Sequence, residues 1–381
     1  MLYRFMDELV RRGHEVYAVT PQRAFRWQPG LRERILSSEA RVSLVPWFKS
    51  QLKSIIQQVP AVERALRKRS QASVWNLVEG LVQNWRPSDV TIATYCMTAF
   101  AAYRLMDDNV PAYHMQHYEE LFFQDDKLGK LARLTYYLPL ELIANSRWLQ
   151  GQVRARFQRE AWLLNPGVDT AVFRPRLDLS SKYNRVSRLR VLSYADTRPF
   201  KGWADSCRAM EVVFRKLGER RVEWIVFGGA KGETSLPVQR VGKVFGAELA
   251  QVYSSAHIVF MPSWYESFPL PPLEAMACGT AVITTRYGTE DYAEHMANAW
   301  VVEPRKPDLL AEAIIELGSD ATLMCRLAEA GVETARRFTW QAAAERLEST
   351  LWKLVLSHQS TMSRFGDISK LLKGELDVLG H

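Results

Sequence analysis

Short hydrophobic runs alternate along the chain with longer stretches in which apolar residues recur at helical spacing. The runs at 89–94, 190–195, 222–227 and 258–261 contain Val, Ile or Leu, and polar or glycine-containing segments follow them. Continuous apolar runs of this kind are typical of parallel strands that are buried on both faces. Because the strands alternate with helical patterns, the sequence predicts an α/β fold with parallel sheets.

The run at 258–261 leads into a segment, residues 263–279, that combines two carboxylates with helix-start and helix-stop residues. Two consecutive prolines, beginning at Pro271, suit a first helical turn because their missing N–H groups cost nothing there, and Gly279 suits a left-handed helix end. The pattern therefore predicts a strand, a tight loop and a helix. Glu266 would lie at the carboxyl end of the strand and Glu274 in the first turns of the helix.

Ligands of open α/β sheets bind at the carboxyl ends of the strands, so this loop is a candidate binding site. Backbone N–H groups of Ser267, Phe268 and Leu270 near a helix N-terminus favour a diphosphate. The carboxylates of Glu266 and Glu274 would repel a phosphate, and we expect each to accept hydrogen bonds from hydroxyls of a ribose and a sugar. The same spacing also fits a capping loop with two solvated glutamates.

Residues 262–280 read Pro-Ser-x-Tyr-Glu-Ser-Phe-Pro-Leu-Pro-Pro-Leu-Glu-Ala-Met-Ala-Cys-Gly-Thr, where x stands for Trp264. It resembles the donor-site signature of family 4 glycosyltransferases of the GT-B fold. This resemblance implies that Glu274 binds the ribose hydroxyls of a nucleotide sugar, and that Glu266 with the following loop contacts the transferred sugar. Pro269, in that loop, stands where many relatives have Gly, which removes one backbone donor.

Two basic residues follow the strand predicted at 190–195. Arg198 and Lys201, placed at a strand end, would neutralise a diphosphate in the ground state and as it departs. A surface turn with two basic residues is the alternative. The resemblance assigns both side chains to the diphosphate, so that no metal ion is needed, and it also places the glycine turn at Gly228, after the run 222–227, in the nucleotide site.

In the first half of the chain, the residues from Pro111 to Phe123 read as a strand that opens into a loop. Alternation along the strand places Tyr113, Met115 and His117 on one face. A histidine at a strand end can hydrogen-bond a sugar hydroxyl or orient an acceptor, although such a residue more often simply completes the sheet end. The resemblance favours the first role for His117, and residues 116–119 are similar to a subgroup that includes rhamnosyl-type transferases.

The N-terminal residues resemble only part of the expected first unit. Residues 7–13 read as the end of a helix and residues 14–20 as a strand, similar to the second half of the first βαβ unit of GT-B enzymes. The strand and glycine-rich loop that precede this pattern in the family are missing from the sequence. We therefore expect Met1 to lie inside a longer reading frame, or the chain to be truncated.

A proline- and glycine-containing segment, residues 163–175, matches the closing stretch of the first domain in the family, and a polar run follows it. We expect an N-terminal, acceptor-side Rossmann-like domain at 1–175, a C-terminal Rossmann-like domain that binds the nucleotide sugar at 176–357, and a tail at 358–381. The resemblance implies that the two domains face a cleft and that the last helix crosses back to the first domain.

Composition limits the class of protein and its partners. The 381 residues exceed one ordinary core, and a hydrophobic content of 47% is that of a globular protein. The net charge is +8, with basic runs at 64–69 and 147–159 that suit an anionic membrane, a diphosphate substrate or plain solvent exposure. No nucleic-acid motif accompanies them. The four cysteines show no metal-ligand spacing, and no apolar run reaches the length of a membrane span, so we expect a cytoplasmic protein with reduced thiols.

The resemblance implies that the chain transfers a sugar from a nucleotide-diphosphate donor to the hydroxyl of a glycan or lipid-linked glycan, with retention of anomeric configuration. Glu266 is not assigned as a nucleophile, because the leaving phosphate helps to take the acceptor proton in such enzymes. The implied setting is surface polysaccharide biosynthesis, with peripheral contact at the inner membrane face and no cofactor besides the donor. A nucleotide-sugar epimerase and a non-catalytic nucleotide-sugar-binding partner protein are the alternatives.

Overall fold

The structure is a computed structural model that describes residues 2–20, 35–37, 69–107, 109–123, 126–184, 186–229 and 232–361. Its contacts divide the chain into two compact units. Unit 1 comprises residues 1–145, 149–164 and 344–381, and unit 2 comprises residues 146–148 and 165–343. The expected basic run at 64–69 lies outside the described residues except for Arg69, and so does the tail from residue 362.

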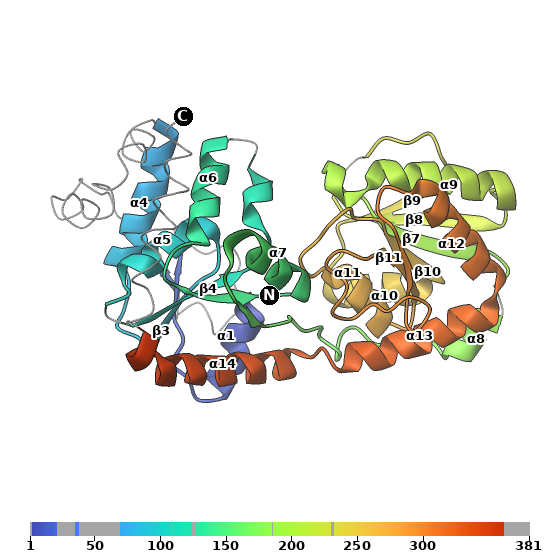
Figure 1. Cartoon of the computed structure of the whole chain (residues 1–381). Helices are drawn as coiled ribbons and strands as arrows, with labels where there is room; N and C mark the ends of the chain where they lie inside the picture. The colour runs from blue at the N-terminus through green and yellow to red at the C-terminus, as the bar shows by residue number, and fades with distance from the viewer. Residues whose placement is uncertain are drawn as a thin grey trace. The chain divides into compact units, whose positions relative to one another are not determined.

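Unit 2 is built on a parallel sheet (Figure 1). Its strands are β7 (Leu189–Tyr194), β8 (Val222–Phe227), β9 (Val238–Gly242), β10 (Ile258–Met261), β11 (Ala281–Thr285) and β12 (Trp300–Val302). They lie in the order β12-β11-β10-β7-β8-β9, and every neighbouring pair is parallel. The strands expected at 190–195, 222–227 and 258–261 are confirmed. No clear hydrophobic run in the sequence predicted β9 or β12.

The central strands of this sheet are buried on both faces, which explains their continuous apolar runs. Val191 and Ile258 pack in one cluster with α9 (Trp203–Leu217), α12 (Pro307–Ser319) and α13 (Ala321–Arg336). Leu192 and Val259 point the opposite way, toward α10 (Gly246–Ser255) and α11 (Leu270–Ala277). Each fully buried side chain of this size contributes about 1.5 to 3 kcal/mol of transfer free energy. The sheet is therefore a stiff platform for the loops at its edge.

The strand order places a switch point between β7 and β10. From β7 the chain moves outward through β8 to β9, and it then returns to β10 on the other side of β7 before moving outward to β12. The helices that follow β7 and β10 consequently pack on opposite faces of the sheet. In folds of this type, ligands bind at the carboxyl ends of the strands beside such a switch point.

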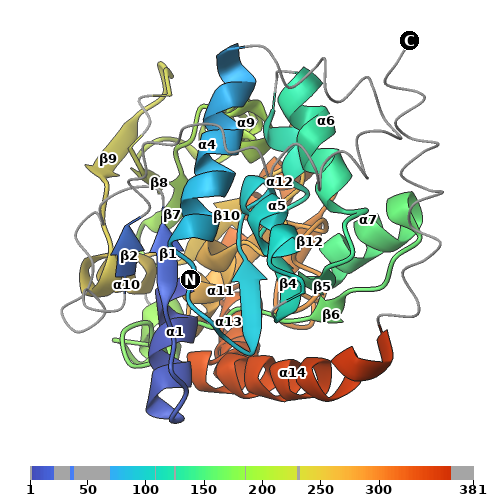
Figure 2. The same ribbon diagram turned by 90° about the vertical axis from the view of Figure 1, so that its left-hand side faces the viewer.

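Unit 1 contains a second parallel sheet with β3 (Val90–Ala93), β4 (Val110–Met115), β5 (Glu141–Ala144) and β6 (Trp162–Leu163). A separate two-stranded parallel sheet pairs β1 (Ala18–Thr20) with β2 (Ile35–Ser37), as Figure 2 shows. The strand expected over 14–20 is thus shorter than predicted, since only its last three residues are in β1. Every residue of β4 is buried.

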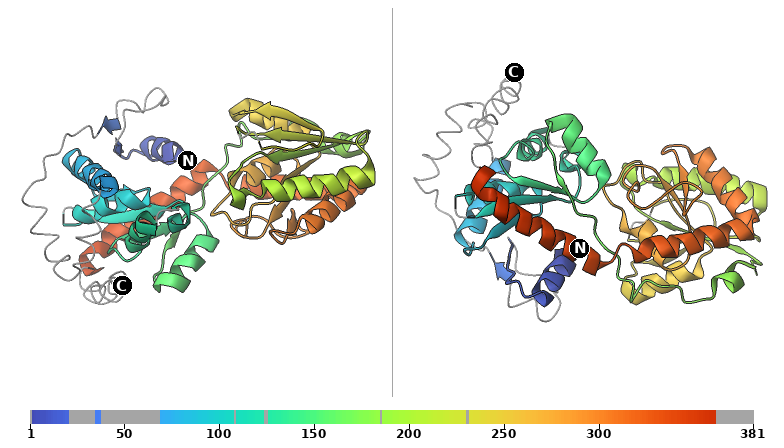
Figure 3. Two further views of the ribbon diagram at one scale, coloured as in Figure 1. Left: turned by 90° about the horizontal axis from the view of Figure 1, so that it is seen from above. Right: turned by 60° about the horizontal axis from the view of Figure 1, so that its bottom comes forward.

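Helices of unit 1 include α1 (Leu2–Arg11), α4 (Arg69–Gln83), α5 (Cys96–Arg104), α6 (Asp126–Thr135) and most of α7 (Arg147–Phe157). The long helix α14 (Trp340–Thr361) lies beside α1 (Figure 3). Arg12, just after α1, donates to Glu348 at 2.9 Å and to Glu345 at 2.8 Å. Within the described ranges, no helix combines the length and apolar sequence needed to cross a membrane.

Candidate functional site

The loops that leave β7 and β10 are joined directly at the switch point. The loop after β7 carries the 3₁₀ turn η3 (Pro199–Lys201), and the backbone N–H of Trp264, in the loop after β10, donates to the carbonyl of Phe200 at 2.7 Å. The rings of Phe200 and Tyr265 are stacked with centroids 5.1 Å apart. The two loops therefore form one surface, and the side chains that they carry are brought within contact distance.

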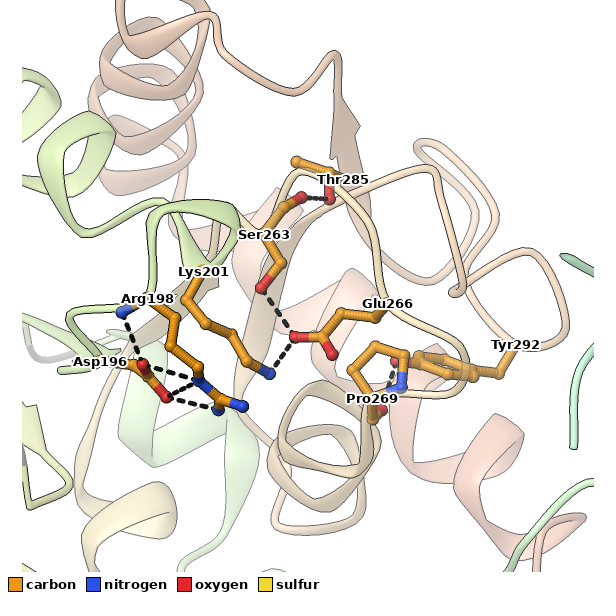
Figure 4. Close-up of polar contacts among 8 residues, drawn as sticks. All are labelled: Asp196, Arg198, Lys201, Ser263, Glu266, Pro269, Thr285 and Tyr292. Atoms are coloured by element: carbon orange, nitrogen blue, oxygen red, sulfur yellow. Dashed lines mark hydrogen bonds and ion pairs between the residues drawn. The ribbon is translucent and has the colours of Figure 1, made fainter. Parts of the chain in front are cut away.

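An ion pair between Lys201 and Glu266 lies across this junction (Figure 4). Lys201 Nζ donates to Glu266 Oε1, and Ser263 Oγ donates to the same oxygen at 2.9 Å. The two charged side chains are 17% and 13% exposed, so the pair is shielded from most of the solvent. Among the described residues, no donor contacts Glu266 Oε2. That oxygen can accept a hydrogen bond from a ligand hydroxyl.

Thr285, at the end of β11, and the residues that follow it bond to the backbone of the loop that carries Glu266. Thr285 Oγ1 donates to the carbonyl of Ser263, and the N–H of Glu266 donates to the carbonyl of Tyr287 at 3.2 Å. Gly288 has φ +93°, and a Cβ atom at this position would lie 2.3 Å from the carbonyl oxygen of Glu266. A side chain there would push the loop away, so glycine is required for this close approach.

Arg198 is held by the carboxylate of Asp196, two residues earlier. Its Nε lies 3.0 Å from Oδ1 and its Nη2 lies 2.6 Å from Oδ2, while its backbone N–H donates to Oδ1 at 2.9 Å. Burial alone would raise the pKa of Asp196, but the hydrogen bonds from Arg198 outweigh burial and hold this pKa below its ordinary value. Asp196 is consequently an anion at neutral pH.

Glu274 lies in the first turns of α11, as the prolines predicted. Burial raises its pKa to about 7, against the opposing effect of a hydrogen bond donated by Tyr253 at 3.2 Å. At the start of the helix, no acceptor among the described residues lies opposite the backbone N–H groups of Phe268 and Leu270. Pro269 is the N-cap, and its carbonyl accepts a hydrogen bond from Tyr292 at 2.7 Å.

Gly228 follows β8 at the same edge of the sheet. Its φ is +114°, and a Cβ atom would lie 2.7 Å from the carbonyl oxygen of Ala195 and 2.8 Å from the ring of Tyr194. Only glycine fits this turn without moving the end of β7. The predicted glycine turn is confirmed, while its contact with a nucleotide stays a prediction.

His117 belongs to unit 1, where it follows β4. Its side chain is 7% exposed, its Nδ1 lies 3.3 Å from the carbonyl of Tyr118, and its ring lies 4.7 Å from that of Phe122. The neighbouring Glu119 carboxylate accepts from the N–H of Cys96 at 2.6 Å, at the start of α5. Glu119 therefore stabilises a helix N-terminus in unit 1, which the sequence pattern did not indicate.

The sequence reasoning missed the residues that hold the expected site residues in place. Asp196 had a local signal, since an aspartate two residues before an arginine commonly closes a turn through its side chain. Ser263 lies only three residues before its partner Glu266, whereas Thr285, Tyr253 and Tyr292 act through contacts that are set by the tertiary fold. In the part of the chain that the structure describes, no group of three His, Cys, Asp or Glu side chains gathers as metal ligands do.

Residues 190–320 match the family model described as Glycosyl transferases group 1. The chain is 29% identical over 209 residues to a D-inositol 3-phosphate glycosyltransferase of Corynebacterium glutamicum, a match that covers 49% of this chain and 50% of that protein. It is 28% identical over 286 residues to the O-antigen biosynthesis protein RfbC of Myxococcus xanthus, covering 69% of this chain and 21% of that protein. The chain thus spans half or less of the length of these curated relatives.

Solved structures show the fold. A sucrose-phosphate synthase from Thermosynechococcus elongatus superposes with a TM-score of 0.72 at 16% identity, covering 93% of both chains. HepE of Anabaena, solved in complex with UDP-glucose, superposes with a TM-score of 0.61 at 19% identity, covering 73% of this chain and 82% of that one. Residues 190–320 are therefore similar to the glycosyl transferases group 1 family, and the chain has the GT-B fold with two Rossmann-like domains.

Proposed function

We propose that this chain transfers a sugar from a nucleoside-diphosphate sugar to an acceptor hydroxyl, with retention of anomeric configuration and without a metal ion. The observation that carries the proposal is the Lys201–Glu266 pair at the switch point between β7 and β10, with Arg198 in the same loop as Lys201 and Glu274 in the helix that follows the Glu266 loop. The match of residues 190–320 to the glycosyl transferases group 1 model supports the same reaction class.

Each side chain has a role that suits its surroundings. The cations of Arg198 and Lys201 neutralise the diphosphate, and the N–H groups of Phe268 and Leu270 at the start of α11 add dipoles of the same sign. Glu266 Oε2 accepts from a hydroxyl of the transferred sugar, and Glu274 accepts from the ribose. In this proposal the Lys201 ammonium donates hydrogen bonds both to Glu266 and to an oxygen of the diphosphate.

In the reaction, the bond between the anomeric carbon and the diphosphate oxygen breaks, and the acceptor oxygen bonds to that carbon from the same face. The acceptor proton passes to the departing diphosphate, whose new charge Arg198 and Lys201 stabilise. Glu266 forms no bond to the sugar. Family resemblance assigns His117 to the sugar, which would make unit 1 the acceptor-side domain and unit 2 the donor-side domain.

The donor and setting are part of the proposal. HepE was solved with UDP-glucose and with UDP, which makes uridine nucleotides the first donors to test. RfbC is named for O-antigen biosynthesis, which supports a role in surface polysaccharide assembly and a glycan or lipid-linked acceptor. We place the protein in the cytoplasm, at times in peripheral contact with the inner face of the membrane.

The test is a calorimetric screen of UDP, dTDP, GDP and ADP against the wild-type chain, Glu274→Ala and Glu248→Ala. Glu248 is an exposed glutamate in the first turn of α10 and serves as the matched control. We expect one nucleotide to bind selectively, and Glu274→Ala to weaken it by about 1 to 3 kcal/mol because charge-assisted hydrogen bonds are lost. Glu248→Ala should bind like the wild type.

Incubation of the corresponding nucleotide sugar with glycan acceptors then separates the three activities. A glycoside product with the anomeric configuration of the donor supports the transferase. Inversion at a ring carbon without transfer would identify an epimerase. Binding with neither reaction would identify a non-catalytic partner protein, and absence of binding by all four nucleotides would contradict the donor site itself.

A further inference from the structure

We propose that Asp196 is a positioning residue that fixes Arg198 and sets the charge of the diphosphate site. The proposal rests on the proposed function, because it concerns how that same site holds a diphosphate. Asp196 itself does not contact the diphosphate. It acts through Arg198, with which it makes four hydrogen bonds or close polar contacts.

The geometry divides the guanidinium of Arg198 into two edges (Figure 4). The edge formed by Nε and Nη2 faces both oxygens of Asp196, at 3.0 Å and 2.6 Å. A guanidinium has five donors in a planar fork, so the edge that carries Nη1 stays directed away from Asp196. The Arg198 side chain is 56% exposed. Its second edge is thus presented to a ligand while the first edge is anchored.

The anchor is fixed more firmly than a surface ion pair. The Asp196 side chain is only 11% exposed. The preceding residue, Ala195, extends the β7–β8 ladder, because its N–H donates to the Phe227 carbonyl at 2.8 Å. The N–H of Arg198 itself closes a turn onto Asp196 Oδ1. The Phe200 ring also lies 5.2 Å from the Arg198 guanidinium carbon. Asp196 therefore locks both the backbone and the side chain of Arg198.

Asp196 also has an electrostatic consequence that a plain turn residue would lack. A partly buried carboxylate beside a diphosphate repels it, and the repulsion is small only while Arg198 stands between the two. Removing Arg198 alone should therefore weaken binding in two ways, because a phosphate contact is lost and the Asp196 charge is left uncompensated. Removing both charges should be less harmful than removing Arg198 alone.

Asn is the informative replacement for Asp196. Its side-chain oxygen can still accept from the N–H of Arg198 and keep the turn, but it has no second oxygen and no charge for the guanidinium. If Asp196 only closes the turn, Asp196→Asn should behave like the wild type. If Asp196 positions Arg198, this variant should lose diphosphate affinity with its melting temperature nearly unchanged.

The experiment measures the affinity of UDP, dTDP, GDP and ADP, and of the matching nucleosides, for the wild type, Asp196→Asn, Arg198→Ala and the double variant. We expect the selected diphosphate to bind about ten-fold more weakly to Asp196→Asn and about 100-fold more weakly to Arg198→Ala. The double variant should regain about ten-fold over Arg198→Ala. Nucleoside affinity should be unchanged throughout. Thr197→Ala, at the exposed position between the two, is the control.

Two results would overturn the proposal. Wild-type affinity in Asp196→Asn would show that the charge and the second oxygen are irrelevant. A double variant that binds no better than Arg198→Ala would show that Asp196 does not oppose the diphosphate. Either result leaves the proposed function intact as long as the wild type binds a diphosphate. Failure of the wild type to bind any of the four would reject the proposed function and this inference together.

Discussion

Glu266 and Glu274 come from the same loop and helix, yet their surroundings differ in a way that divides their roles. Glu266 faces the ammonium of Lys201 and the hydroxyl of Ser263. Among the described residues, the Glu274 carboxylate has only the hydroxyl of Tyr253 as a hydrogen-bond partner, and burial raises its pKa to about 7. Glu266 thus lies in an ion pair, whereas the charge of Glu274 depends on pH and on the ligand.

The Glu274→Gln variant should therefore change how stability depends on pH. The pKa of Glu274 in the folded state lies above that of an unfolded glutamate, so its stabilising contribution is present below about pH 4.5 and is lost as pH rises through about 7. Between these values we expect the free energy of unfolding of the wild type to fall by about 1 to 3 kcal/mol relative to Glu274→Gln. Urea unfolding at several pH values measures the difference.

The same ionisation predicts the pH dependence of donor binding. Ribose hydroxyls donate to the ionised carboxylate, so affinity for a nucleotide sugar should rise as pH passes through about 7 in the wild type and stay flat in Glu274→Gln. A nucleotide sugar is the better probe, because its diphosphate has no group that ionises in this range. Parallel pH profiles in the two proteins would contradict a role for the Glu274 charge.

Lys201 and Glu266 should be coupled in stability but separable in activity. Lys201→Met leaves a shielded carboxylate without its partner, and we expect a loss of about 1 to 3 kcal/mol in the free energy of unfolding. The double variant Lys201→Met with Glu266→Gln should recover most of that loss without recovering sugar transfer. Urea unfolding and a transfer assay give the two readouts, and additive losses in stability would show that the pair is not coupled.

At the scale of elements, the segment after β11 supports the loop after β10. Tyr292 donates to the Pro269 carbonyl at 2.7 Å, and Gly288 lies against the backbone of Glu266. This segment follows the neighbouring strand β11, and its contacts stiffen the loop after β10. Arg147 and Asn165 bind Asp291 in the same segment, each at 2.9 Å, which anchors it within unit 2.

Tyr292→Phe should loosen that loop. The substitution leaves the partly buried Pro269 carbonyl without its donor, and we expect a loss of about 1 to 2 kcal/mol in stability together with weaker binding of the nucleotide sugar. Tyr183→Phe is a matched control, because the Tyr183 hydroxyl is also buried and bonds the Gly279 carbonyl at 3.1 Å, at the other end of α11. The control should lose stability without a comparable loss of affinity. Equal losses of affinity would mean that Tyr292 acts only through global stability.

Sequence patterns predicted those parts of the site that are local in the chain. The loop from Glu266 to Glu274 needs only a strand, two prolines and a glycine, which can be read directly. The junction of Lys201 with Glu266 could not be read in this way, since it depends on β10 returning to lie beside β7. Strand order is a property of the whole sheet, and short edge strands such as β9 carry too few buried residues to show a pattern.

Over the whole molecule, the net charge of +8 predicts attraction to anionic surfaces. Helix α7 exposes Arg154 and Arg156, although Arg154 pairs with Glu160 at 2.8 Å and Arg156 lies over the Tyr118 ring. An exposed pair of this kind is weak, so both arginines remain able to bind lipid phosphates. The basic helix is therefore the part of the described surface that we expect to meet an anionic membrane.

Vesicle flotation tests this expectation. The wild-type chain should float with vesicles that contain phosphatidylserine at low salt, should stay behind at high salt, and should not float with neutral vesicles. Reversing the charge at Arg154 should weaken binding by about 1 to 2 kcal/mol, because a favourable charge near the lipid surface becomes unfavourable. Arg336→Glu is the control, since Arg336 is equally exposed and also pairs with a glutamate, but it lies on α13. Equal losses in both variants would show that net charge alone drives binding. Flotation that does not depend on salt, or no flotation at all, would contradict electrostatic binding of this chain to an anionic membrane.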